Sequence, residues 1–304
     1  MKRLLLAFAG ASLLPSAMPA VDYSTIAQPL SAVVQKEMND WGIGGVAVAL
    51  IDDQDIVFAE GFGEAKRDSV FRCGSISKLF NALAVMQQVE AGKLDLDAPL
   101  QTYGEGLLPI NPFPGEPPVT LRQILCHRSG LQREGAVGGY LDPSEPGLAA
   151  TVASVSPCVL VTRPGEKTRY SNLAPSIAGF LVGRVSGEGF EKYQQAHLLG
   201  PLGMKNSAWT LATAPRDRII VSHMRVADGH GGWTRRETPL FDLGTIPAGN
   251  LFTTAEDLGR LVSGLVANDG RFVKPETLAE MWTPQLTEET KGFGLGYVVG
   301  AFRE

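Results

Sequence analysis

The amino-acid sequence predicts an α+β fold in which a group of helices interrupts a sheet. Strand patterns occur early, over residues 46–51 and 56–60, and the segment FGLGYVVGAF at 293–302 has the pattern of a late strand. Between them, several runs of residues have apolar side chains that recur with helical spacing. Because strands, helices and strands follow in this order, we expect the helices to be inserted between two parts of one sheet.

The early strand patterns lead into the first long helix. A turn at 52–55 joins the two strands, and a helix is expected after Ser75. The apolar positions of this helix recur at Leu79, Leu83, Met86 and Val89. Gly92 is expected to end it. Residues 97–170 are rich in Pro and Gly and therefore predict loops between short helices.

Two further helices are expected in the second half of the chain. The segment NLAPSIAGFLVGRVSG at 172–187 is apolar and closes with Gly187. The segment TTAEDLGRLVSGLVANDG at 253–270 opens with Thr254 and Asp257 at the spacing of a capping box, and it stops at a glycine. Both helices precede the late strand.

The composition is that of a globular protein with a sizeable core. Of the 304 residues, 44% are hydrophobic and 19% are charged, and this length suggests one large domain or two interleaved lobes. The formal net charge is −5 at pH 7, and no run of Lys or Arg occurs. These features argue against nucleic acid as a partner.

Residues 1–20 have the three-part layout of a secretory signal peptide. Two basic residues are followed by an apolar run, too short to span a bilayer, and then by small residues. Met18 stands where a small residue is preferred if cleavage follows Ala20, so an uncleaved anchor is the alternative. We expect a secreted or periplasmic protein with a single domain over 21–304 and no membrane span beyond the signal segment.

The helix after Ser75 carries the first candidate for chemistry. Lys78 lies three residues later on the same helix face, so its amine can reach the serine hydroxyl. A lysine whose pKa is lowered by burial or by other cations can take the proton of a serine and make it a nucleophile. No other serine in the chain has a lysine at this spacing. The alternative is that Ser75 caps the helix and Lys78 is solvated.

A second candidate pair lies in the segment PGEKTRYSNLAP, where Tyr170 precedes Asn172 by two residues. A phenol near Lys78 can relay a proton between nucleophile and leaving group, and the amide can orient the lysine or hold a substrate carbonyl. Of the six tyrosines, Tyr170 alone has an asparagine at this spacing. The alternative is an asparagine in a turn beside a core tyrosine.

Together, Ser75-x-x-Lys78 and Tyr170-x-Asn172 resemble the serine β-lactamase and penicillin-binding superfamily. The sequence is most similar to the class C β-lactamase-like branch, which includes esterases, D-aminopeptidases and transpeptidase-like proteins. The resemblance covers roughly residues 43 to 298, and its supporting segments occur in the order of that branch. These segments are CGSISKLFNALAVMQQVEAGKLDLDAPL, VTLRQILCHRSGL, PGEKTRYSNLAPSIAGFLVGRVSG, LLGPLGMKNS, PAGNLFTTAEDLGRLV and GFGLGYVV.

The resemblance implies a role for each of the four residues. Ser75 would be the acylated nucleophile, Lys78 and Tyr170 would share the general base and acid roles, and Asn172 would position the substrate and the lysine. The substrate would be a small ester, a β-lactam or a D-amino-acid peptide, and no cofactor is implied.

The resemblance also implies a β-lactamase/transpeptidase-like architecture, in which an antiparallel sheet is flanked by helices. A large all-helical lobe would hold residues 71 to about 240. The sheet lobe would hold residues 21–70 and 241–304, with the site at the junction of the two lobes.

A third motif of this family, Lys- or His-x-Gly, is expected after the FGLGY segment, and the sequence stops at Glu304 before reaching it. His230-Gly231-Gly232 matches the residues of this motif but precedes its expected position. A Gly-rich surface turn explains the segment. We therefore expect a C-terminally truncated chain. The alternative to a hydrolase is a catalytically degenerate protein that binds a peptide or a partner.

Other reactive side chains have simpler explanations. Cys73, Cys126 and Cys158 cannot all pair, and we expect them to be unpaired and buried. Cys73 lacks a neighbouring histidine that would make it a nucleophile. His127 and Ser129 suggest a second catalytic pair, but the resemblance indicates a structural turn. No His-x-x-Glu-His or Cys-x-x-Cys spacing is present, so we expect no metal site.

Overall fold

The computed structural model describes residues 22–107, 109–156, 158–286 and 292–300, and the expected signal peptide lies outside these ranges. The α-helices are α1 (Ser24–Trp41), α2 (Ser77–Glu90), α3 (Leu121–Leu125), α4 (Gly147–Ala153), α5 (Leu173–Ser186), α6 (Phe190–Gln194), α7 (Ile246–Gly249), α8 (Ala255–Ala267) and α9 (Pro275–Met281). The strands are β1 (Gly45–Asp52), β2 (Asp55–Gly63), β3 (Phe71–Arg72), β4 (His223–Ala227), β5 (Trp233–Glu237), β6 (Phe252–Thr253), β7 (Gly292–Phe293) and β8 (Val298–Val299). Short 3-10 or π turns are η1 (Gly74–Ile76), η2 (Leu100–Tyr103), η3 (Glu105–Leu107), η4 (Gln195–Leu199) and η5 (Arg216–Arg218).

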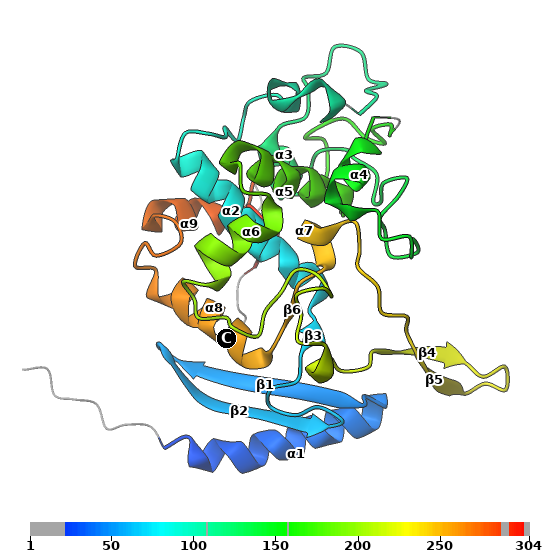
Figure 1. Cartoon of the computed structure of the whole chain (residues 1–304), viewed down its shortest axis with the longest axis vertical. Helices are drawn as coiled ribbons and strands as arrows, with labels where there is room; N and C mark the ends of the chain where they lie inside the picture. Colours follow the sequence, from blue (N-terminus) through cyan, green and yellow to red (C-terminus); the bar gives the residue numbers. More distant parts are fainter. Residues whose placement is uncertain (1–21, 108, 157, 287–291, 301–304) are drawn as a thin grey trace, which may run out of the picture.

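The early strands form an antiparallel hairpin between two helices. β1 pairs with β2 in antiparallel register, as Figure 1 shows, with α1 on one face and α8 on the other. Because helices cover both faces, β1 is a nearly continuous apolar run instead of an alternating one. Gly259 of α8 lies over Ile51 and Ile56, where the absence of a side chain lets the helix approach the hairpin.

The centre of the molecule is occupied by α2, which is surrounded by other helices (Figure 1). α2 packs against α5, α6 and α7, and the side chains of Leu83 and Met86 are almost fully buried. α5 approaches α7 closely at Gly179. A side chain at this position would overlap the ring of Pro247, so the close approach requires a glycine. The predicted helices after Ser75 and over 172–187 are confirmed, and this helix packing positions the start of α2.

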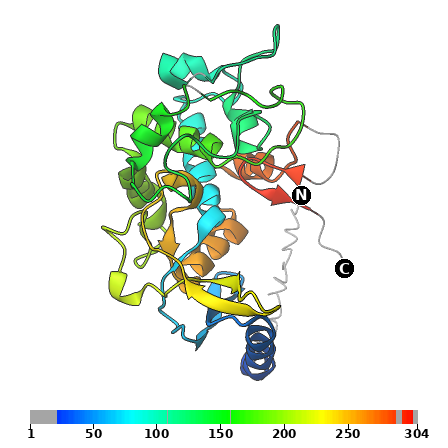
Figure 2. The ribbon, with the colours of Figure 1, turned by 90° about the vertical axis from the view of Figure 1, so that its right-hand side faces the viewer.

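The late segment does not join the early hairpin. β7 and β8 pair with each other, and Figure 2 shows this red pair well away from the blue β1–β2 hairpin. The prediction of one late strand in a common sheet is therefore wrong for the described residues. The cause is a tight turn in which the Gly294 N–H donates to Tyr297 O at 2.9 Å and Gly296 takes a φ of 84°.

The range assigned to an all-helical lobe also contains strands. β4 and β5 form an exposed antiparallel hairpin that projects from the body of the molecule (Figure 1). Asp228 Oδ1 accepts hydrogen bonds from the N–H groups of His230 and Gly232, at 2.8 and 2.9 Å, and so closes its turn. The α+β class is confirmed, but the expectation of a purely helical region up to about residue 240 is wrong.

The described ranges also bear on the expectations about membranes, disulfides and metals. None of the helices there combines the length and the apolar composition that a membrane crossing requires. Cys73, Cys126 and Cys158 are free thiols, the last two buried and the first half-buried. No group of three or more His, Cys, Asp or Glu side chains is placed to hold a metal ion in these same ranges.

We predict that Gly179→Ala destabilises the protein by about 1–3 kcal/mol. The added carbon would lie 2.3 Å from Cγ of Pro247, a ring atom that cannot swing away, and this overlap outweighs the better helix propensity of alanine. Thermal or urea unfolding measures the change. Gly106→Ala is the control, because no atom lies within 4 Å of its added carbon. Equal stability of both variants would contradict the close packing of α5 on α7.

Candidate active site

Ser75 lies where a strand pair meets the central helix. β3 pairs with β6, and the Cys73 N–H donates to Leu251 O at 2.9 Å, so the backbone before Ser75 is held in place. Gly74 then takes a φ of 55°, a left-handed conformation that favours glycine, and turns the chain into η1. The side chain of Ser75 is left exposed at the start of the helical segment.

The structure contradicts the alternative in which Ser75 caps a helix and Lys78 is solvated. Ile76 occupies the N-cap position of α2, and Lys78 is only 7% exposed. Nζ of Lys78 donates to Asn172 Oδ1 at 2.9 Å and to Ala248 O at 2.7 Å, and it lies 3.2 Å from Ser75 Oγ. Because the two carbonyl oxygens only accept, they use both N–H groups of a neutral amine, and its lone pair is left for the Ser75 hydroxyl.

Tyr170 and Asn172 approach Lys78 from the start of α5. Tyr170 Oη donates to Ser75 Oγ at 2.7 Å, and Lys78 Nζ lies 4.9 Å from the centre of the tyrosine ring. Asn172 is the N-cap residue of α5 and is almost fully buried. Its Oδ1 faces Lys78, while its Nδ2 donates to Glu134 Oε1 at 2.6 Å. The residues of both sequence motifs therefore meet in one hydrogen-bonded cluster.

The environment of Lys78 favours its neutral form. Burial lowers the pKa of the Lys78 amine to about 7, and two charged neighbours act on this pKa in opposite directions. The Glu134 carboxylate raises it, and the Arg133 guanidinium lowers it. At neutral pH a substantial fraction of Lys78 is therefore unprotonated, and only this fraction can accept a proton from a hydroxyl group.

His127 and Ser129 do not form a second catalytic pair. His127 Nδ1 accepts the Ser171 N–H at 3.3 Å, and its ring lies against the ring of Tyr170 with centroids 4.3 Å apart. Burial, together with the charge of Lys78, lowers the pKa of His127 to about 3. Ser129 is fully buried, and its Oγ accepts from the Leu131 N–H. The segment is thus a turn that supports Tyr170.

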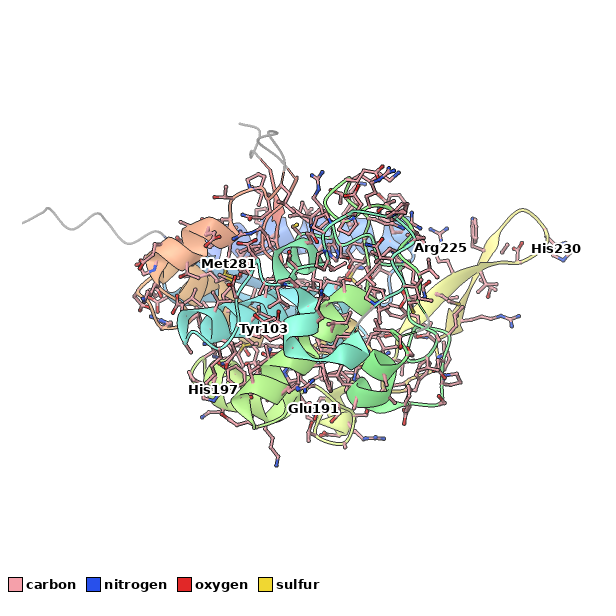
Figure 3. The ribbon with its side chains drawn as sticks, turned by 90° about the horizontal axis from the view of Figure 1, so that it is seen from above. Tyr103, Glu191, His197, Arg225, His230 and Met281 are labelled. Carbon is pink, nitrogen blue, oxygen red and sulfur yellow. The ribbon has the colours of Figure 1, made fainter. Side chains whose placement is uncertain are left out.

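Two other candidate groups, His230-Gly231-Gly232 and Cys73, take no part in the catalytic cluster. Figure 3 shows His230 at the far tip of the β4–β5 hairpin, so the sequence His230-Gly231-Gly232 is a surface turn. Cys73 precedes Ser75 closely in sequence, but burial raises the pKa of its thiol to about 12. Because the thiolate is the reactive form, Cys73 is inert at neutral pH.

The cluster includes groups that the motifs did not indicate. Glu134 holds the amide of Asn172, and the Arg133 carbonyl accepts the Asn172 N–H at 2.7 Å. Ala248 contributes a main-chain oxygen to Lys78. Every residue has a main-chain carbonyl, so the sequence alone does not indicate that the carbonyl of Ala248 contacts Lys78. Arg133 and Glu134 lie in a Pro/Gly-rich loop region, where an adjacent pair of opposite charges is normally taken as solvated surface.

A cavity of about 500 Å³ opens beside Glu134. It is lined by Arg133, Glu134, Gly135, Ala136, Val137, Gly139, Tyr140, Leu141 and Asp142. The hydroxyl of Tyr140 lies against Gly249 at the end of α7. Because Glu134 joins this cavity to the cluster, the loop over 133–142 forms one wall beside the candidate site.

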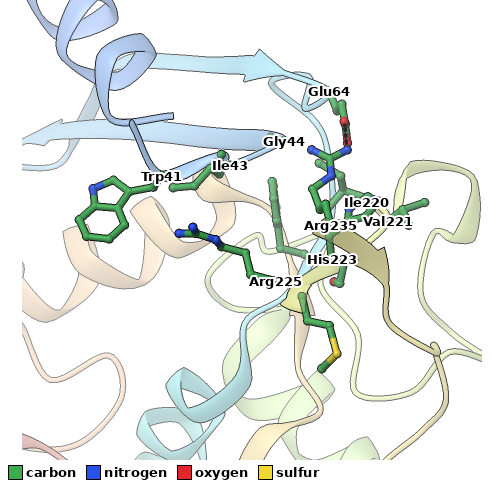
Figure 4. Close-up of a pocket in the computed structure, with 14 residues that line it drawn as sticks. Trp41, Ile43, Gly44, Glu64, Ile220, Val221, His223, Arg225 and Arg235 are labelled. Atoms are coloured by element: carbon green, nitrogen blue, oxygen red, sulfur yellow. Dashed lines mark hydrogen bonds and ion pairs between the residues drawn. The ribbon is translucent and has the colours of Figure 1, made fainter. Parts of the chain in front are cut away.

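A second cavity, of about 360 Å³, lies between the end of α1 and the β4–β5 hairpin. Figure 4 shows that Glu64 and Arg235 form an ion pair in it, near Trp41 and Arg225. None of the four motif residues lines this cavity. We therefore place the candidate active site at Ser75.

Comparison with known proteins identifies relatives along nearly the whole chain. The Beta-lactamase family model matches residues 30–303. Esterase EstB of Burkholderia gladioli is 28% identical over 94% of this chain and 82% of its own length. The D-alanyl-D-alanine-carboxypeptidase/endopeptidase AmpH of Escherichia coli is 26% identical over 75% of this chain and 59% of its own length.

The fold has counterparts among solved structures. The octameric penicillin-binding protein homologue from Pyrococcus abyssi superimposes with a TM-score of 0.72 at 25% identity, over 89% of this chain and 64% of that protein. The chain thus spans less than two thirds of two of these three relatives. The match to the family model covers most of the sequence, and the chain belongs to the Beta-lactamase family.

Proposed function

We propose that this chain is a secreted serine hydrolase that acylates Ser75 and then hydrolyses the acyl-enzyme. One observation carries the proposal: Ser75 Oγ lies 2.7 Å from Tyr170 Oη and 3.2 Å from Nζ of the buried Lys78. An exposed hydroxyl between a phenol and an amine has a proton acceptor on one side and a proton donor on the other. Secretion is proposed from the pattern of residues 1–20.

Acylation would begin with the neutral amine of Lys78. Nζ accepts the Ser75 proton while Oγ bonds to the substrate carbonyl carbon, which gives a tetrahedral oxyanion and a Lys78 ammonium. The backbone N–H of Ser75 lies in the first turn of the helical segment, where helices leave N–H groups unpaired, and so can donate to the oxyanion. The bond from the carbonyl carbon to the leaving oxygen or nitrogen would then break as Tyr170 passes a proton to that atom. Tyr170 would regain a proton from Lys78, and the alcohol or amine would depart.

Deacylation would use the same groups in reverse. A water molecule loses a proton to the Lys78 and Tyr170 pair as its oxygen bonds to the acyl carbon. The bond from Oγ to this carbon then breaks, and Ser75 regains its proton. Asn172 would keep the amine in place through both steps, since its Oδ1 is bonded to Nζ.

Small esters are the substrates that this arrangement serves most readily, because an alkoxide leaving group needs the least protonation. β-Lactams and D-amino-acid peptides are the other candidates, and the names of the esterase and carboxypeptidase relatives accord with esters and peptides. Turnover of a nitrophenyl ester without turnover of a chromogenic cephalosporin would contradict a β-lactamase activity.

We predict that a fluorophosphonate probe labels Ser75 stoichiometrically, and that Ser75→Ala and Lys78→Ala abolish labelling. The reason is that the probe reacts with an activated serine, and both changes remove one partner of the activation. Intact mass and peptide mapping measure the adduct. Ser129→Ala is the control and should keep the label, because Ser129 is fully buried and its hydroxyl accepts from the Leu131 N–H. Absence of labelling in the folded wild-type protein would favour the alternative in which the chain only binds a peptide or partner.

We also predict that ester hydrolysis falls as pH decreases through about 7. The folded pKa of Lys78 is about 7, and below that value the amine is protonated and cannot accept the serine proton. The rate should therefore drop about tenfold for each further pH unit. The pH profile of kcat/KM measures the midpoint. A rate that stays level down to pH 5 would contradict Lys78 as the base.

A further inference from the structure

The loop residues Arg133 and Glu134 contact Asn172 and Tyr170 of the proposed machinery without belonging to either motif. Glu134 Oε1 accepts from Asn172 Nδ2 at 2.6 Å, and Asn172 Oδ1 accepts from Lys78 at 2.9 Å. A carboxylate can only accept hydrogen bonds, so it fixes which end of the amide faces it. The amide oxygen is thereby directed at Lys78, and a chain of contacts runs from Glu134 to Ser75.

The backbone of this loop is tied to the start of α5. The carbonyl of Arg133 accepts the N–H groups of Asn172 and Leu173, at 2.7 and 3.3 Å. The guanidinium carbon of Arg133 lies 5.2 Å from the centre of the Tyr170 ring, and its Nε lies 3.6 Å from Glu134 Oε1. The two side chains therefore hold a defined position relative to Tyr170 and Asn172.

Few ionisable groups face Lys78. In the part of the chain that the structure describes, they are Glu134 and Arg133 from the loop, Tyr170 from the segment before α5, and His127 from the turn after α3. Burial holds the pKa of His127 at about 3, so this ring is neutral near pH 7. Glu134 and Arg133 are then the two charged groups that act on the Lys78 amine, and they shift its pKa in opposite directions.

We propose that Glu134 and Arg133 are positioning residues of the Ser75 site, which align Lys78 through Asn172 and set its charge through two opposed neighbours. This inference rests on the proposed function, in which Lys78 takes the proton of Ser75. It assigns two tasks to Glu134. The carboxylate oxygen orients Asn172, and the negative charge favours the ammonium form of Lys78. The positive charge of Arg133 favours the neutral amine form of Lys78.

The test is the pH profile of kcat/KM for a nitrophenyl ester in single variants of the full chain. Glu134→Gln keeps an oxygen that accepts from Asn172 but removes the charge, so the pKa of Lys78 falls. The acid limb should then move to lower pH by on the order of half a unit or more. Arg133→Gln removes the opposite charge and should move the limb to higher pH. Glu188→Gln is the matched control, because Glu188 pairs with His197 and not with the cluster.

A second variant separates orientation from charge. Glu134→Leu removes both the charge and the acceptor, so Asn172 is no longer held and the plateau rate at high pH should fall about tenfold below that of Glu134→Gln. Thermal unfolding of each variant shows whether it is folded. A purely structural role for Glu134 would lower rates without moving the midpoint.

The outcomes distinguish this inference from the proposed function. Midpoints that shift in opposite directions for the two loop variants support it. Midpoints that do not move, or that move in the same direction, overturn it while leaving the function intact, provided that the wild-type protein is labelled at Ser75 and Lys78→Ala is not. If the wild-type protein is not labelled at all, the proposed function itself is wrong.

Discussion

The buried amine of Lys78 is the feature on which the rest of the site depends. A buried amine costs free energy unless its hydrogen-bonding groups are satisfied, and here each partner comes from a different element. Ser75 belongs to η1, Asn172 begins α5, and the carbonyl of Ala248 belongs to α7. The site therefore forms only when these elements are packed together around α2.

The surrounding structure uses neighbouring residues to hold that packing. Ser77 Oγ, within the first turn of α2, accepts the Leu251 N–H at 3.1 Å, and the carbonyl of Leu251 accepts from Cys73. The helix start is thus fastened to the segment after α7. Gly179 of α5 lets this helix approach Pro247, which is a residue of α7. These contacts explain why a lysine can be held with its lone pair directed at a serine on the surface.

Sequence reasoning could predict the parts of the site that depend on local spacing. Ser75 and Lys78 are one helical turn apart, and the structure places them within 3.2 Å because α2 forms where its apolar periodicity predicts. The joining of this pair to Tyr170 and Asn172 was expected from a family resemblance, since a separation of 95 residues carries no local signal. Their catalytic roles stay a prediction.

Other parts depend on tertiary contacts and could not be read from the sequence. The carbonyl of Ala248 has no side-chain signature, and Glu134 is recognisable only once Asn172 is beside it. The prediction of a single late strand is wrong, because the apolar residues around Gly294 and Gly296 match a strand pattern but form two short strands joined by a turn. The two glycines instead permit a turn, which is held by a bond from the Gly296 N–H to Leu125 O.

The most direct test of this account is a titration of the lysine side chains by NMR, with carbon-13 label in lysine and Lys78→Met for assignment. The account predicts one resonance that titrates near pH 7 and is missing from the variant, as burial of the Lys78 amine requires. If instead every lysine of the folded protein titrates near the unperturbed value of about 10.4, Lys78 is charged at neutral pH and cannot be the base for Ser75.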